Sequence, residues 1–183
     1  MDMSEEYAKT QFVVNMECHF WLIREFLPGM LEKGKGHVVS IASMAGCAGQ
    51  PMLTDYCASK FGAVGLMEGL RIEMKREKKN VACTTICPFF INTGMFEGTE
   101  ASLIFPFLNQ GYVVNRIVNA ILQEENEVSI SWLMGVAVHT CKGLFPSCVN
   151  DLVVWGTLGW DTMANFKGRQ EKNAIHQTKV SHK

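Results

Sequence analysis

The chain has 183 residues, 48% of them hydrophobic and 19% charged, and its formal net charge at pH 7 is -1. This length predicts one domain with a substantial core. The near-neutral charge excludes the basic surface typical of nucleic-acid-binding proteins, so no nucleic-acid partner is expected. Seven cysteines without C-x-x-C spacing indicate buried thiols in a reducing compartment, not a disulfide framework or a zinc site. The acidic, polar first residues predict no signal peptide and no N-terminal membrane anchor.

Helical and strand patterns alternate along the chain. Apolar residues recur every three or four positions from about 4 to 31, which predicts a long helix whose end is weakened by Pro28 and Gly29. The β-branched run 37–43 predicts a buried parallel strand. The later predicted elements are a helix over 55–78, a strand over 81–87, a helix over 112–125 and a short strand over 127–131. This order predicts βαβ units around a parallel sheet, and therefore an α/β fold.

The C-terminal third is strongly apolar over 129–160. Lys142 and Asp151 interrupt it, so no membrane-spanning helix is expected. Two interpretations stay open: an interfacial helix pair or the wall of a lipophilic channel, and ordinary core or dimer packing. The polar tail 169–183 is predicted to be disordered.

Three polar side chains at and after the end of the first predicted strand suggest a catalytic site. Tyr56 and Lys60 stand four positions apart and so share a helix face, and Ser43 lies at the end of the preceding strand. A phenol is too weak an acid to serve as a base at neutral pH, but a neighbouring ammonium is expected to lower its pKa. Ser43 could hold the same substrate oxygen. The carboxyl ends of parallel strands, where open α/β sheets bind ligands, suit this role.

A purely structural interpretation competes with the catalytic one. A tyrosine at a helix start usually packs, and a lysine one turn later is usually solvated, so the pair alone is weak evidence. The order of serine, strand, small-residue turn and helix strengthens it. Cys57 is better explained as a buried thiol than as a nucleophile, because no histidine lies near it in sequence. The five scattered histidines give no ligand spacing, so no metal site is predicted.

The stretch "SIASMAG" followed by "YCASK" resembles the active-site signature of the short-chain dehydrogenase/reductase family. The segments 13–30 and 86–96 resemble two further stretches of that family, and "HFW", "DYCASKFGAVG" and "MANFKGR" are similar to its retinol-dehydrogenase-like microsomal branch. The family's Gly after Pro88 is Phe89 here. The resemblance implies a Rossmann-type parallel sheet with flanking helices, with residues 1–168 as the C-terminal catalytic part of the domain.

The resemblance also implies residue roles. Tyr56 would be the acid/base, Ser43 would orient the substrate oxygen, and Lys60 would lower the pKa of Tyr56 and hold the nicotinamide ribose. Asn15 would support a water that relays protons to Lys60, although a lone polar residue in a helix is more often simply solvated. Tyr56, Lys60 and three residues after the next strand would bind the cofactor: Pro88, Ile91 and Thr93. A helix N-cap or turn role is the alternative for Thr93.

By the same resemblance the activity is hydride transfer between NAD or NADP, with NAD slightly favoured, and a lipophilic alcohol or ketone. Retinol or retinal is expected first and a hydroxysteroid second. The resemblance further implies a location at the endoplasmic reticulum membrane or the lipid droplet surface, facing the cytoplasm. A homo-oligomer and a peripheral membrane contact are compatible with it.

One expected motif is missing. A dinucleotide needs a Gly-rich loop between the first strand and helix, and no such spacing occurs in this sequence. The stretch 29–36 imitates a P-loop, but it leads from a helix into a strand, the reverse of the required order. The sequence therefore predicts a sheet that is N-terminally truncated, without its first βαβαβ half. It is then either a fragment of a longer enzyme or a short product that acts only by association with full-length subunits.

Overall fold

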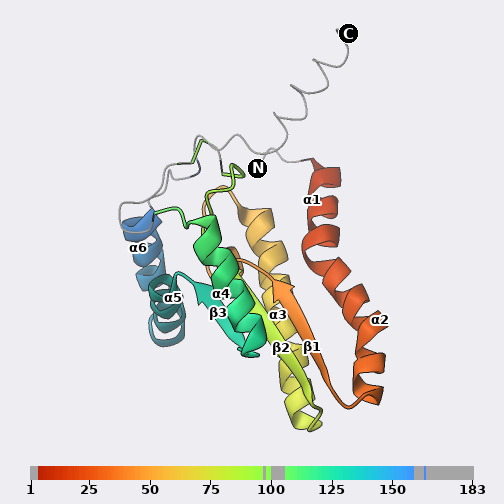
Figure 1. Cartoon of the computed structure of the whole chain (residues 1–183). Coiled ribbons are helices and arrows are strands. Elements are labelled where there is room, and N and C mark those ends of the chain that lie inside the picture. The colour runs from red at the N-terminus through yellow and green to blue at the C-terminus, as the bar shows by residue number, and fades with distance from the viewer. Residues whose placement is uncertain (1–3, 97, 100–105, 159–162, 164–183) are drawn as a thin grey trace.

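The computed structural model describes residues 4–96, 98, 99, 106–158 and 163, which form helices around a small parallel sheet (Figure 1). The helices, in chain order, are α1 (Glu5–Phe12), α2 (Cys18–Glu32), α3 (Thr54–Arg76), α4 (Gln110–Leu122), α5 (Trp132–Leu144) and α6 (Ser147–Leu158). A π-helical turn, η1 (Val13–Glu17), joins α1 to α2, and a short 3₁₀ turn, η2 (Met44–Gly46), follows the first strand. The strands are β1 (Gly36–Ile41), β2 (Val81–Pro88) and β3 (Glu127–Ile130).

The three strands pair in parallel in the order β1-β2-β3. The register sets Gly36 against Val81 at one end of the β1–β2 pair and Pro88 against Ile130 at the carboxyl end of the β2–β3 pair. The carboxyl ends of β1 and β2 therefore open at the same edge. The predicted α/β fold, a Rossmann-type parallel sheet with flanking helices, is confirmed.

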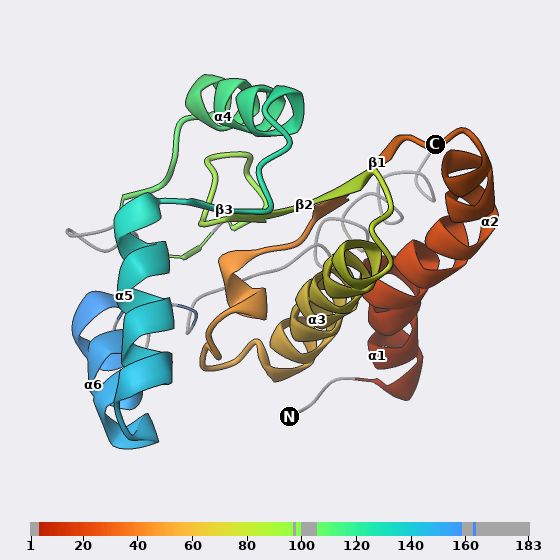
Figure 2. The same cartoon turned by 90° about the horizontal axis from the view of Figure 1, so that it is seen from below.

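Helices cover both faces of the sheet. Seen along the sheet, α4 lies on one face, while α3 and the α1–α2 segment lie on the other (Figure 2). Alternate residues of β2 pack on opposite faces of the sheet, because successive side chains of a strand point to opposite sides. Cys83 packs with the buried Met67 of α3, and Ile86 packs with Val113 of α4. β2, which is buried at all positions except Ala82, is thus the centre of the core.

The N-terminal helix departs from the single long helix expected. Residues 13–17 form a π-helical turn, which inserts one extra residue into the ladder and is frequent at functional sites. The predicted end of the helix near residue 31 is confirmed, because α2 continues through Pro28 to Glu32. Burial of Leu27 and Leu31 against α3 and β1 outweighs the hydrogen bond lost at the proline.

The apolar C-terminal segment forms the helix pair α5 and α6. Within the described part of the chain, no helix is both long enough and apolar enough to cross a membrane. The interfacial and packing interpretations of this pair both stay predictions. The predicted tail 169–183 lies outside the described residues.

Candidate active site

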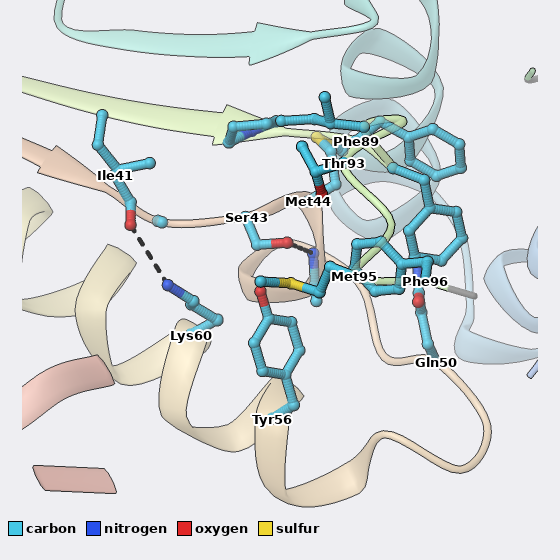
Figure 3. Close-up of a pocket in the computed structure, with 15 residues that line it drawn as sticks. Ile41, Ser43, Met44, Gln50, Tyr56, Lys60, Phe89, Thr93, Met95 and Phe96 are labelled. Carbon is cyan, nitrogen blue, oxygen red and sulfur yellow. Dashed lines mark hydrogen bonds between the residues drawn. The ribbon is translucent and has the colours of Figure 1, made fainter. Parts of the chain in front are cut away.

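A cavity of about 270 Å³ opens at the carboxyl ends of β1 and β2 (Figure 3). Its lining includes six residues that the sequence singled out or that neighbour them: Ser43, Tyr56, Lys60, Pro88, Ile91 and Thr93. The structure therefore brings together side chains that lie up to fifty positions apart in the sequence. The cavity is smaller than the sites that enclose whole drug-sized ligands, so it matches one end of a dinucleotide rather than all of it.

Ser43 is placed by the turn that follows β1. Its backbone is extended, and its Oγ accepts a hydrogen bond of 3.1 Å from the N–H of Ala45, which caps η2. Gly46 is the last residue of this turn and contacts α3. A Cβ at this position would lie 2.6 Å from the carbonyl oxygen of Lys60. Only glycine allows the turn to approach the helix backbone so closely. The position of Ser43 relative to α3 depends on this contact.

Tyr56 and Lys60 project from one face of α3 towards the end of β1, as their spacing predicts (Figure 3). The Lys60 Nζ lies 5.8 Å from the centre of the Tyr56 ring. It donates a hydrogen bond of 3.3 Å to the carbonyl oxygen of Ile41. The ammonium is thus tied to the last residue of the strand whose end carries Ser43.

The pKa of Tyr56 differs from the expectation. Burial raises the pKa of Tyr56, and a hydrogen bond with Ser43 lowers it by less. The spacing of Tyr56 and Lys60 predicts a lowered pKa, but burial of the phenol decides the direction. The protein thus holds Tyr56 as a neutral phenol, the form that donates a proton to a carbonyl oxygen.

The ammonium of Lys60 can donate more hydrogen bonds than the described residues accept from it. Its side chain is only 9% exposed, and burial lowers its pKa. An ammonium carries three donors, whereas within the described residues the carbonyl oxygen of Ile41 is its one hydrogen-bond acceptor. A buried cation with unused donors at the rim of a cavity suits hydroxyl groups of a ribose. The residues present therefore fit the nicotinamide end of a dinucleotide.

Asn15 lies beside the site but does not line the cavity. Its Nδ2 donates a hydrogen bond of 3.1 Å to the Oγ of Ser59, which in turn donates one of 2.8 Å to the carbonyl oxygen of Tyr56. The π-helical turn η1 carries Asn15 to this position. The water relay assigned to Asn15 stays a prediction. Ser59, which is fully buried, was missed, because only the fold shows that it bridges η1 to the backbone of Tyr56.

The segment after β2 forms the opposite wall. Pro88 is the last residue of β2, and Ile91 forms a parallel bridge with Leu108. Thr93 donates its backbone N–H to the carbonyl oxygen of Ile91 at 2.8 Å, and no helix begins there within the described residues. The N-cap alternative for Thr93 is therefore wrong, whereas the turn alternative agrees with this hydrogen bond. Contact of these three residues with a cofactor stays a prediction.

An aromatic cluster makes much of this wall apolar. The ring centres of Phe89 and Phe90 are 4.7 Å apart, and those of Phe90 and Phe96 are 4.6 Å apart. All three rings line the cavity, with Met95 beside them. The sequence signal for this wall is "PFF", in which Phe89 replaces the Gly that follows the Pro in the family. This replacement by itself does not predict an apolar wall. Aromatic rings in tilted contact, as here, give an apolar wall that favours an apolar ligand.

Cys57 has the character of a core thiol. It is 5% exposed, and burial raises its pKa. A thiol with a raised pKa is a poor nucleophile at neutral pH. The structure supports the buried-thiol interpretation.

Comparison with known proteins identifies the family. A family model described as short chain dehydrogenase matches residues 1–103. The chain belongs to the short-chain dehydrogenase family. It is 38% identical over 183 residues to short-chain dehydrogenase/reductase family 16C member 6 of Bos taurus, covering 98% of this chain and 57% of that protein. It is 44% identical over 128 residues to epidermal retinol dehydrogenase 2 of Homo sapiens, covering 68% of this chain and 41% of that protein. The chain thus spans about half the length of these relatives.

Solved structures agree on the fold. A short-chain dehydrogenase from Burkholderia cenocepacia, in complex with NADP, superposes with a TM-score of 0.65 at 20% identity, covering 81% of this chain and 61% of that one. A second, from Burkholderia phymatum in complex with NAD, gives a TM-score of 0.61 at 22% identity, covering 72% and 56%. At these identities the likeness concerns the fold alone.

Proposed function

We propose that this chain carries the catalytic part of an NAD(P)-dependent oxidoreductase that interconverts a lipophilic alcohol and its aldehyde or ketone. The observation that carries the proposal is the convergence of Ser43, Tyr56 and Lys60 on one cavity at the strand ends. Packing alone gives no reason to place a phenol, a hydroxyl and a buried ammonium with unused donors around the same opening.

Each residue of the site has a separate role in the proposed reaction. A nicotinamide cofactor supplies the hydride for reduction of the carbonyl carbon. The phenol of Tyr56 donates its proton to the carbonyl oxygen, and Ser43 orients that oxygen by a second hydrogen bond. Lys60 binds ribose hydroxyls and stabilises the phenolate that remains after proton transfer. In the oxidation direction the phenolate removes the proton from the alcohol.

The apolar wall and the relatives support the substrate class. The rings of Phe89, Phe90 and Phe96 offer a surface for a hydrocarbon skeleton rather than a sugar or an acid. Relatives of this chain are named retinol dehydrogenases. We therefore put retinol and retinal first and a hydroxysteroid second, with NAD slightly favoured over NADP.

Location follows from the same resemblance. We place the protein at the cytoplasmic face of the endoplasmic reticulum membrane or of a lipid droplet, in peripheral contact with it. Trp132 of α5 and Trp155 of α6 are both exposed, and exposed tryptophans suit a lipid headgroup boundary. A lipophilic substrate would be taken up from that surface.

A second candidate is a chain that is inactive alone and acts by associating with another subunit. The observation in its favour is that β1 is an edge strand of the described sheet. An open, parallel edge can pair with another chain.

A substrate panel tests the proposal. The purified 183-residue chain is incubated with retinal or with a steroid ketone, each with NADH or NADPH, and loss of nicotinamide absorbance is followed. We expect turnover that is fastest with retinal and NADH. Turnover only with small polar aldehydes would contradict the substrate class. Absence of turnover in every combination would contradict catalysis by this chain and favour the associating subunit.

A further inference from the structure

Three side chains capable of binding a metal converge away from the cavity's polar trio, from segments far apart in the sequence. Cys47 follows η2, Glu127 begins β3, and His139 lies on α5. The Cys47 Sγ, a carboxylate oxygen of Glu127 and a ring nitrogen of His139 all lie within 4.8 Å of one another. The Nε2 of His139 is 3.1 Å from an Oε1 of Glu127. The fold therefore closes a triangle of sulfur, oxygen and nitrogen atoms.

The size of this triangle is close to that of a coordination shell. Zinc binds thiolate sulfur at about 2.3 Å and imidazole nitrogen or carboxylate oxygen at about 2.0–2.2 Å, so two ligands of one tetrahedral ion stand roughly 3.3–3.8 Å apart. The side chains of Glu127 and His139 are half exposed, and small rotations bring them into that range. Cys47 is buried, so its sulfur is held in place by the protein.

Two neighbours hold Cys47 in place. Cys87, which is fully buried in β2, hydrogen-bonds to the sulfur of Cys47. The Nζ of Lys142 donates a hydrogen bond of 2.8 Å to the carbonyl oxygen of Cys47. A thiol binds a metal as the thiolate, so zinc binding would release its proton. Cys87 and Lys142 thus position the sulfur.

We propose that Cys47, Glu127 and His139 form a zinc-binding site. A thiolate, an imidazole and a carboxylate are the ligands that zinc takes in proteins, whereas magnesium and calcium take oxygen alone. Three protein ligands leave the fourth tetrahedral position to water. Cys87 is a positioning residue, since its hydrogen bond orients the ligand sulfur from the second layer.

The proposed ion would join elements that bear on the catalytic cavity. Cys47 directly follows the turn η2, which is capped by Ser43. Glu127 and His139 belong to β3 and α5, on the far side of that turn. A bound ion would therefore fix the turn against α5, in addition to the hydrogen bond from Lys142. Binding to the folded state alone raises stability by mass action.

Cobalt provides the test, because a thiolate bound to Co²⁺ gives a charge-transfer absorption band that oxygen and nitrogen ligands do not. The purified chain is stripped with a chelator and titrated with Co²⁺, and Zn²⁺ is then added in competition. We expect a charge-transfer band that saturates at one equivalent and is displaced by Zn²⁺. Substitutions Cys47→Ser, Glu127→Gln and His139→Ala are each expected to weaken binding more than ~10-fold, and Cys47→Ser to remove the band.

The control is Cys148→Ser, which changes an exposed cysteine outside the triangle. It should bind Co²⁺ like the wild type, while circular dichroism confirms that every variant is folded. The proposal is overturned if the wild type shows no band, or if the band survives Cys47→Ser. It is also overturned if Glu127→Gln and His139→Ala both bind as tightly as the wild type. A ligand variant that loses its fold is replaced by the milder Glu127→Asp or His139→Gln.

Discussion

The phenol of Tyr56 sits where burial, not the neighbouring ammonium, sets its pKa. The Nζ of Lys60 is 5.8 Å from the centre of the ring. It donates its hydrogen bond to the carbonyl oxygen of Ile41, and its side chain lines the cavity. The hydrogen bond with Ser43 opposes the effect of burial without reversing it. Tyr56 is therefore poised as an acid before any ligand binds.

A pH profile of carbonyl reduction reports this state. A raised pKa keeps the phenol protonated at all lower pH values, and the acid form is lost only as pH rises through that pKa. We expect kcat/KM for reduction to stay level between about pH 7 and pH 9, since the profile reports groups of the free enzyme. A fall within that window, absent in Tyr56→Phe, would show that the pKa of Tyr56 is lowered, as the spacing of Tyr56 and Lys60 predicts.

At this scale the sequence predicted which residues meet, but not their state. Ser43, Tyr56 and Lys60 could be found because a helix of regular geometry places positions four apart on one face, and the strand before it fixes the serine. The direction of the Tyr56 pKa depends on how deeply the phenol is buried, which spacing does not reveal. Ser59 was missed for a different reason, because its partner Asn15 lies 44 positions away and only the fold brings the two together.

Among the elements, the contact between η2 and α3 determines the shape of the site. Gly46 brings the turn against the backbone of α3, where a Cβ would lie 2.6 Å from the carbonyl oxygen of Lys60 and 2.8 Å from the Cγ2 of Val64. Backbone cannot move aside as a flexible side chain can. Any side chain at this position must push the turn, and Ser43 with it, away from the helix.

The substitution Gly46→Ala tests this contact. Overpacking at a rigid contact is expected to lower the free energy of unfolding by about 1–3 kcal/mol and to reduce turnover by displacing Ser43. Chemical denaturation and the retinal assay measure the two effects. The matched control is Gly49→Ala, because a Cβ at Gly49 meets nothing within 4 Å. Equal stability of the two variants would contradict the proposed role of the contact.

The strands and helices could largely be predicted, because their periodicity follows from one buried face each. The boundaries of α3 and β2 agree with the expectation to within two residues. The π-helical turn at 13–17 could not be predicted, because it arises from packing of η1 on α3 and not from a local signal. The end of α2 at Glu32 agrees with the expectation to within one residue.

At the scale of the described molecule, the α2–β1 side presents an open strand edge beside exposed apolar side chains. β1 is an edge of the described sheet, and a groove of about 200 Å³ runs between it and α2, lined by Leu22, Phe26 and Met30 among others. Phe26 is 59% exposed. An open edge flanked by exposed apolar side chains is a surface at which pairing with another chain is expected.

We expect the chain to self-associate through this side. Replacing Phe26 by lysine should shift the weight-average mass in analytical ultracentrifugation towards the monomer, since a charge in an apolar contact is costly to bury. Leu122→Lys is the control, because Leu122 is also an exposed apolar residue but lies at the end of α4, on the other face of the sheet. An equal effect of both variants would show that general hydrophobicity, not this side, drives association.

The proximity of Cys47, Glu127 and His139 could not be predicted from the sequence. The sequence predicted no metal site because its ligand-type residues are scattered, and spacing motifs detect only ligands that lie close together along the chain. Here the sheet register and the packing of α5 on β3 supply the proximity. Sites assembled by tertiary packing alone leave no local pattern.

The central claim is that Tyr56 transfers the proton in a nicotinamide-dependent reaction, and one comparison tests it most directly. Turnover of retinal with NADH is measured for Tyr56→Phe and for Tyr112→Phe, which removes an exposed hydroxyl on α4. Loss of a general acid is expected to reduce kcat at least ~100-fold in Tyr56→Phe, with nucleotide binding retained, while Tyr112→Phe stays at the wild-type level. Wild-type turnover in Tyr56→Phe would contradict the account.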